Sequence, residues 1–179
     1  MKTYARLAVF TLVAATLLAT FAFKNSYAEE LSDEQKTRIQ ANCLSIKGSL
    51  NQLHASDALL RVNRGQVYES VGTKLMNSFN SRLANNGLDN KGLVVVGGEY
   101  QTVLATFRTD YQLYERQLSA AIRIDCEKTP SEFHTALEDA RAKRAAVYDD
   151  VQRLNETIDD YRTAVGDFML NFQRVTGKN

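Results

Sequence analysis

The chain has 179 residues, of which 44% are apolar and 24% charged, a composition typical of one globular domain and unlike that of a disordered chain. It contains one proline and no tryptophan. Long helices are therefore favoured over a β-sandwich, which needs turn residues roughly every 8–12 positions.

Residues 1–28 have the pattern of an export signal. Two basic residues precede a mostly apolar run over residues 7–23, and the segment ends in Ser-Tyr-Ala, with small residues three and one positions before the expected cut. We expect cleavage between Ala28 and Glu29. The alternative is an uncleaved anchor, because the apolar run lies at the lower limit of a spanning helix, roughly 17–25 residues. Either way, the rest of the chain is expected in the cell envelope or outside the cell.

Removal of this segment would change the charge of the protein. It takes away three basic residues and no acidic one, so the formal charge falls from +1 to −2. A nearly neutral product has neither the basic surface that binds nucleic acid nor a polybasic patch for anionic lipid. We therefore expect no nucleic-acid partner, and membrane contact only through residues 7–23 if they are retained.

A first helix is predicted over residues 33–85. It opens with a capping box, Ser32 with Gln35, and carries two charged residues, Asp57 and Arg64, on an otherwise apolar heptad seam. The apolar members of this seam are Ile39, Cys43, Ile46, Leu50, Leu53, Leu60, Val67 and Val71. Beyond them the spacing becomes four residues at Leu75, Phe79 and Leu83, which predicts local unwinding.

A second helix is predicted over residues 93–126. Three consecutive valines followed by two glycines make residues 88–98 poor helix material, so we expect a turn and an irregular stretch there, or a short extended segment. The helix then carries an aromatic seam from Tyr100 to Tyr114. Core filling is the favoured interpretation of this row, and a platform for stacking a ligand is the alternative.

A third helix is predicted over residues 130–175. Thr129, Pro130 and Glu132 form a strong start signal. Its seam has one charged member, Arg144. The twelve apolar members are Phe133, Leu137, Ala140, Val147, Val151, Leu154, Ile158, Tyr161, Val165, Phe168, Phe172 and Val175. Together the three segments predict an all-α protein, an elongated antiparallel three-helix coiled-coil bundle over residues 29–179 that follows the signal peptide.

The two cysteines, Cys43 and Cys126, are predicted to form a disulfide because the chain is expected to be exported. Two unpaired buried thiols are the alternative. The cysteines have no spacing typical of zinc or haem, and neither histidine has a ligand-spaced companion. We therefore expect no metal and no cofactor.

The disulfide sets the levels of the helices. It would make the third helix run parallel to the first with an offset of about 87 residues, which places Arg144 level with Asp57. Counting back along the second helix reaches a position next to Tyr111. We therefore predict a polar layer of Asp57, Tyr111 and Arg144. Its favoured role is to fix the register of the bundle.

Three alternatives to this layer stay open. The same residues could form a binding or proton-relay site, or the arginines could extend to the rim of the bundle. Asp57 could also pair locally with Arg61. Arg64 has no obvious mate in the third helix.

The sequence contains no GxGxxG or GxxxxGK(S/T) nucleotide-binding motif, no GxSxG or SxxK nucleophile motif, no HExxH metalloprotease motif and no EF-hand loop. Neighbouring acids such as Asp149 and Asp150 would point about 100° apart on a helix, so we expect solvated faces and not catalytic pairs. From Cys43 to about residue 150, "LHASDALLRVNRGQVYES" and "FRTDYQLYERQLSAAIRIDC" resemble small exported helical proteins of ultrasmall, reduced-genome bacteria, an uncharacterised family. The resemblance implies export and a helical architecture, and no catalytic residue.

These features favour an exported, non-enzymatic helical bundle that acts through contact with another protein or with itself. The alternative is a ligand-binding or sensory bundle that uses the Tyr100–Tyr114 face or the Asp57/Arg144 layer. A cavity beside Phe107, Tyr111 and Tyr114 would favour the ligand-binding alternative. An uncovered apolar stripe on the third helix would imply a dimer.

Overall fold

The structure, a computed structural model, describes residues 31–177. These residues form helices and their connections and contain no strand, which confirms the predicted all-α class. The expected signal peptide and its cleavage site between Ala28 and Glu29 lie outside this range. In chain order the helices are α2 (Asp33–Ala41), α3 (Cys43–Ser70), the π-helix η2 (Val71–Asn77), α4 (Ser78–Asn85), α5 (Lys91–Arg123) and α6 (Pro130–Thr176).

Several helix ends follow from local sequence. Ser32 caps α2 with both hydrogen bonds of a capping box: its Oγ accepts from the Gln35 N–H, and its own N–H donates to Gln35 Oε1. Pro130 occupies the first turn of α6, where its missing N–H costs no helical hydrogen bond. Gly177 follows α6 with a φ of 63°, a left-handed conformation that glycine adopts readily. No helix in residues 31–177 is both long and apolar enough to span a membrane.

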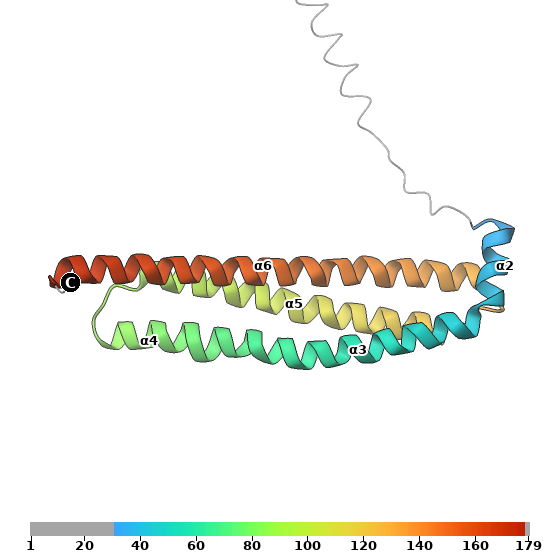
Figure 1. Ribbon diagram of the computed structural model, residues 1–179, viewed down its shortest axis with the longest axis horizontal. Helices are drawn as coiled ribbons and strands as arrows, with labels where there is room; N and C mark the ends of the chain where they lie inside the picture. The colour runs from blue at the N-terminus through green and yellow to red at the C-terminus, as the bar shows by residue number, and fades with distance from the viewer. Residues whose placement is uncertain (1–30, 178–179) are drawn as a thin grey trace, which may run out of the picture. The chain divides into compact units, whose positions relative to one another are not determined.

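The first predicted helix is interrupted twice. At Asn42 the chain bends, and α2 turns across the beginning of α6, where Gln40 Nε2 donates to the Glu127 carbonyl at 2.8 Å (Figure 1). The second interruption is η2, whose wider turns have i→i+5 hydrogen bonds. It begins at Val71, where the apolar spacing changes to four residues, so the expected unwinding takes the form of a π-helix.

The seam predicted for the second half of this helix is wrong by one position at Val67 and Leu75, whereas Val71, Phe79 and Leu83 lie at the core as predicted. Val67 and Leu75 are exposed, and the adjacent Tyr68 and Met76 are buried instead. A straight α-helix drifts by roughly 20° per heptad relative to a strict seven-residue repeat. Between Cys43 and Tyr68 this drift adds up to most of the 100° that separates neighbouring residues. The core side of α3 therefore moves to the following residue.

The stretch expected to be irregular is helical from Lys91 onward, and no extended segment forms there. The buried Gly97 explains why the valine-rich turn packs as a helix. A Cβ at this position would come within 3.2 Å of Asn80 Nδ2, which itself donates to the Leu93 carbonyl at 3.2 Å. Asn90 Nδ2 in turn donates to the Asn80 carbonyl at 2.7 Å. These contacts with α4 outweigh the low helix propensity of the segment.

Helices α3, α5 and α6 lie side by side, and α5 runs in the opposite direction to the other two (Figure 1). Cys43 at the start of α3 is joined to Cys126, in the loop between α5 and α6, with a Cα–Cα distance of 5.6 Å. The predicted disulfide is thus confirmed, and it places the start of α3 level with that loop.

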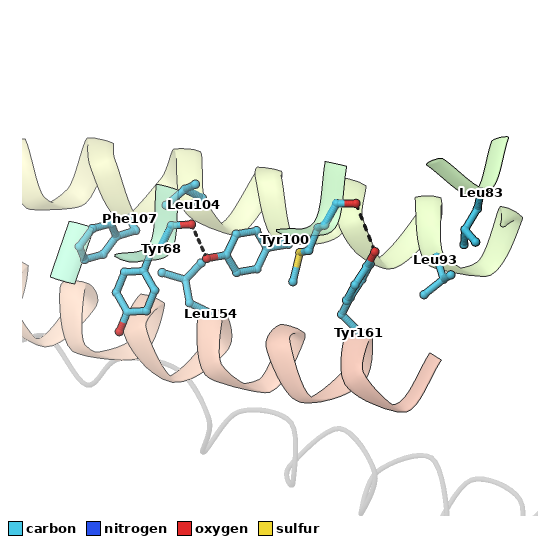
Figure 2. Close-up of a cluster of buried hydrophobic side chains, with 9 residues drawn as sticks. Tyr68, Leu83, Leu93, Tyr100, Leu104, Phe107, Leu154 and Tyr161 are labelled. Atoms are coloured by element: carbon cyan, nitrogen blue, oxygen red, sulfur yellow. Dashed lines mark hydrogen bonds between the residues drawn. The ribbon is translucent and has the colours of Figure 1, made fainter. Parts of the chain in front are cut away.

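The core divides into two clusters of buried side chains. The disulfide cluster consists of Cys43, Leu50, Tyr111, Tyr114, Leu118, Cys126, Phe133 and Ala140. The tyrosine cluster consists of Tyr68, Met76, Leu83, Leu93, Tyr100, Leu104, Phe107, Leu154 and Tyr161 (Figure 2). Val147, which is partly buried, packs against both.

Two buried hydroxyls hold the tyrosine cluster to the backbone around η2. The Tyr100 hydroxyl donates to the Tyr68 carbonyl at 2.8 Å, and the Tyr161 hydroxyl lies 3.2 Å from the Met76 carbonyl (Figure 2). Gly72 makes room for the first contact, because a Cβ there would approach Tyr100 Cε1 to 3.1 Å. Tyr100 of α5 thus contacts the backbone just before the π-helix, and Tyr161 of α6 contacts it near the end of the π-helix.

Candidate functional site

A pocket of about 250 Å³ opens between α3, α5 and α6 at the level where the two core clusters meet. We call it the Asp57 pocket. Its apolar and aromatic wall is formed by Leu60, Tyr68, Phe107, Tyr111, Tyr114, Val147, Tyr148 and Val151. Its charged wall is formed by Asp57, Arg61, Arg64 and Arg144.

The pocket exists because α3 contributes no buried residue between Asp57 and Tyr68. This distance is about three turns of helix. In these turns the positions that face α5 carry Arg61 and Arg64, which are exposed, and the side chain of Leu60 is 49% exposed. Long charged side chains keep their heads in water and do not fill a core. At this level the aromatic side chains of α5 are only 3–6% exposed, and charged side chains of α3 such as Arg61 line the space beside them.

Asp57 forms the closed end of the charged wall and joins all three helices. Arg144 of α6 donates to it twice, from Nε to Oδ2 at 3.0 Å and from Nη2 to Oδ1 at 3.3 Å. The Tyr114 hydroxyl of α5 donates to Oδ2 at 2.7 Å. The Asp57 side chain is 10% exposed and that of Arg144 is 52% exposed, so the pair lies at the rim of the core.

These partners decide the charge state of the carboxyl. Burial by itself would raise the pKa of Asp57, but the hydrogen bonds from Arg144 and Tyr114 outweigh it and hold the pKa below its usual value. For Tyr114, burial and the neighbouring carboxylate both raise the pKa of the hydroxyl. At neutral pH the site is therefore an ionised aspartate that receives hydrogen bonds from a guanidinium and from a neutral phenol.

The aromatic wall is continuous across the junction of the two clusters. Tyr68 meets Phe107 edge to face with ring centroids 5.7 Å apart, and the Phe107 and Tyr111 centroids are 6.4 Å apart. Tyr111 meets Tyr114 edge to face at 6.2 Å. The Arg61 guanidinium carbon lies 5.0 Å from the centre of the Tyr111 ring, within the range of a cation–π contact.

The structure brings Asp57 and Arg144 together across 87 residues, the offset deduced from the disulfide. The tyrosine that bonds the carboxylate is Tyr114, however, and not Tyr111, which instead lies under Arg61. The count back along the second helix assumed helix up to Cys126, whereas α5 ends at Arg123. Residues outside a helix can advance more than 1.5 Å each, so the level of Asp57 is reached sooner.

The structure shows the surroundings of Arg61 and Arg64, whose partners the sequence alone did not determine. Arg61 forms no ion pair with Asp57, and neither Arg61 nor Arg64 has a carboxylate partner within 4 Å among residues 31–177. Both line the pocket. In the predicted Tyr100–Tyr114 face, Tyr100 belongs to the closed core, and only the part from Phe107 to Tyr114 reaches the pocket.

Two further buried polar groups escaped the sequence reasoning. Asn80 Oδ1 accepts from the Tyr161 hydroxyl at 2.7 Å, which forms a second polar layer in the tyrosine cluster. Asp150, expected to be solvated, is fully buried and pairs with Arg153 one turn further along α6. Burial, together with repulsion from Asp110 on α5, raises the pKa of Asp150. Its Oδ2 has no hydrogen-bond partner.

Within the part of the chain that the structure describes, no three His, Cys, Asp or Glu side chains gather closely enough to hold a metal ion. The Asp57 pocket has an aromatic wall and a charged rim. No protein-family model, no curated protein and no solved structure matches this chain.

Proposed function

We propose that the protein is an exported, non-enzymatic, antiparallel three-helix bundle that binds a small molecule in the Asp57 pocket. The observation that carries the proposal is the interruption of the core between the two clusters, where aromatic side chains of α5 line an open space. Concave, mostly apolar pockets with a few converging polar groups are typical small-molecule sites, and the space between the helices of a bundle is a common place for them.

A purely structural role explains this region less well. A bundle built only for stability would carry apolar side chains at positions 61 and 64, as it does at the buried positions of Leu50 and Met76. Instead, about three turns of α3 cover the aromatic row with arginines. This arrangement favours ligand binding over the protein-contact role that the sequence alone favoured.

The charge states at the site support a binding role and not an enzymatic one. A general base needs a pKa near the working pH. The pKa of Asp57 is instead lowered by its two partners, and that of Tyr114 is raised. Neither group is suited to exchange a proton at neutral pH. Export is supported by the signal-like residues 1–28 and by the disulfide, which is typical of proteins in oxidising compartments.

The binding proposal can be tested with a matched pair of variants. Leu60 lines the pocket, whereas its neighbour Leu59 is 67% exposed and does not. Leu60→Trp should block the pocket, and Leu59→Trp adds the same side chain outside it. In a thermal-shift screen of small aromatic and aliphatic compounds, we expect hits that raise Tm by several degrees. These hits should be lost in L60W and kept in L59W. A screen in which no compound distinguishes the two variants would contradict the proposal.

The export proposal has its own test. The full chain is expressed in a bacterial host, and the protein is recovered separately from the cytoplasm, the membrane and the exported fractions. We expect an exported product whose first residue is Glu29 by mass spectrometry. A product that keeps residues 1–28 in the membrane fraction would support the anchor instead. A cytoplasmic product of full length would contradict export.

A second candidate function, self-association, is favoured by the last turns of α6. Phe172 and Val175, the last two members of the predicted seam, are 38% and 86% exposed, so the apolar stripe continues beyond the core. A groove of about 530 Å³ lies beside them, between the end of α6 and the start of α5. Sedimentation velocity should show a dimer that Phe172→Ser with Val175→Ser converts to a monomer. A monomer at all concentrations would exclude this candidate.

A further inference from the structure

We propose that the ligand of the Asp57 pocket is a small aromatic anion: one or two rings that carry a carboxylate or sulfonate. The inference rests on the proposed binding function and adds the chemical class of the ligand. It is carried by the two arginines of α3 that face the pocket and by the aromatic wall opposite them.

The charge of the pocket wall favours an anion. Three guanidiniums and one carboxylate line the space, and the carboxylate of Asp57 is already neutralised by two hydrogen bonds from Arg144. Arg61 and Arg64 remain, with no carboxylate within 4 Å among the described residues. Glu115 lies near enough to contribute to the raised pKa of Tyr111, but it does not line the pocket. A guanidinium binds a carboxylate through two parallel N–H donors, which suits an acid group at this rim.

The shape and lining of the pocket favour a ring. An apolar cavity of about 150 Å³ is large enough to bind benzene. The Asp57 pocket has about 250 Å³, which leaves room for a second ring or a substituent. Tyr148 is 62% exposed and offers a ring to which an aromatic ligand can pack with a centroid distance of 4.5–7 Å. Phe107, Tyr111 and Tyr114 are 3–6% exposed and present only a small part of their rings to the pocket.

The two walls together give the ligand an orientation. The ionised Asp57 repels an acid group from the end of the pocket that it occupies with Arg144 and Tyr114. The acid group is therefore placed at Arg61 and Arg64 on the open side of α3, and the ring lies against the exposed Tyr148 of α6. Arg61 lies over the Tyr111 ring, and this cation–π contact holds the guanidinium at the place where the acid group binds.

The test uses two fluorescent probes with the same ring system. Naphthalene-1-sulfonate carries the anion, and 1-methylnaphthalene lacks it. Both are titrated against the oxidised full chain, with Leu60→Trp and Leu59→Trp as blocked and open controls. We expect the sulfonate to bind at least about tenfold more tightly than the neutral probe, a difference of about 1.4 kcal/mol. Its affinity should also fall with added salt.

Two double variants that remove the same charge test whether Arg61 and Arg64 bind the acid group. Arg61→Gln with Arg64→Gln should weaken the sulfonate about tenfold and leave the neutral probe within about twofold. Arg116→Gln with Arg123→Gln removes the same charge from exposed positions of α5 that do not line the pocket, and should change neither probe. Circular dichroism of each variant verifies that the helices are intact.

The outcomes separate this inference from the function on which it rests. If both probes bind equally and R61Q/R64Q affects neither, the anionic class is wrong, while binding in the pocket stands. If palmitate binds in competition with the sulfonate and more tightly than naphthalene-1-carboxylate does, the aromatic class is wrong. If both probes bind L60W as well as they bind L59W, the binding proposal itself fails.

Discussion

Asp57 and Asp150 are both buried aspartates paired with an arginine, yet their surroundings shift their pKa values in opposite directions. Asp57 on α3 accepts hydrogen bonds from α5 and α6, and its pKa is lowered. Asp150 pairs within α6, faces Asp110 on α5, and has a raised pKa. Burial raises the pKa in both cases, so the difference comes from the partners.

The comparison shows what each aspartate does for the bundle. Asp57 receives three hydrogen bonds from two other helices and so holds α3 to the pair formed by α5 and α6. Asp150 brings a second carboxylate into the contact between α5 and α6 and leaves its Oδ2 without a partner. A buried polar atom without a hydrogen bond costs about 1–3 kcal/mol. We therefore expect Asp57 to stabilise the fold and Asp150 to weaken it.

The largest expected effect concerns the disulfide, which fixes the position of the helix that carries Asp57. Replacing Cys43 and Cys126 by serine opens a loop of 83 residues. In the chain-entropy model this should lower the free energy of unfolding by about 4 kcal/mol. Urea denaturation of the two proteins measures the loss. Equal stability of the double serine variant and the oxidised protein would contradict the prediction.

The same variant sharpens the comparison between the aspartates. The Asp57 pair depends on the placement of α3, whereas Asp150 lies between α5 and α6 and does not. In the double serine background, Asp57→Asn should therefore cost less than in the oxidised protein. The effect of Asp150→Asn should not change between the two backgrounds.

Asp57→Asn is expected to lower the free energy of unfolding by about 2 kcal/mol. Losing one partner of a fully buried ion pair costs about 3–5 kcal/mol, and the half-exposed Arg144 recovers part of this through water. A double-mutant cycle with Arg144→Gln should give a coupling energy of about 1 kcal/mol. Absence of coupling in that cycle would show that the two side chains do not stabilise each other.

Asp150→Asn should have the opposite sign and raise the free energy of unfolding by about 1 kcal/mol at neutral pH. The amide has nearly the same shape, removes the repulsion from Asp110, and can donate to that carboxylate. Asp149→Asn changes a neighbouring exposed carboxylate and serves as the control. A loss of stability in D150N with no change in D149N would mean that the pair with Arg153 outweighs the repulsion.

The smallest effect is a difference in pH dependence. The pKa of Asp150 is raised in the folded state, so its penalty is present at neutral pH and disappears as the pH falls through the folded value toward 3.8. The advantage of D150N should shrink over that range. The pKa of Asp57 is lowered, so the cost of D57N should persist to pH 3.8 and shrink only below it. Urea denaturation of the wild type and both variants from pH 7 to pH 3 measures these trends.

The sequence was informative wherever a long regular pattern or a covalent link sets the position of a residue. The disulfide could be predicted from two cysteines in an expected export product, and its level led to Asp57 and Arg144. The partner tyrosine was misassigned because the count crossed the end of α5, where the rise per residue changes. The pocket itself could have been suggested by two arginines one turn apart opposite an aromatic row.

Other features depend on packing that no local pattern shows. Tyr68 and Met76 replace Val67 and Leu75 in the core because small rotations add up along α3 and the π-helix then widens the turn. Because Tyr68 and Met76 have the same spacing in the sequence as Val67 and Leu75, this spacing alone does not show which pair faces the core. Asp149 and Asp150 are adjacent acids, and only the packing of α6 against α5, where Asp110 lies, buries the second of them.

The division of the core at the Asp57 pocket has a consequence for the order in which the molecule assembles. Helices α5 and α6 are joined by a short loop and pass through both clusters, so their mutual contacts close few residues and are expected to form early. Helix α3 must then pack against this pair at two places, one in each cluster, which are separated by the stretch between Asp57 and Tyr68 that contains no buried residue. Native-state hydrogen exchange should therefore find the amides between Asp57 and Tyr68 opening with less free energy than those of either flanking turn. A bound ligand would join the two attachments into one cooperative unit.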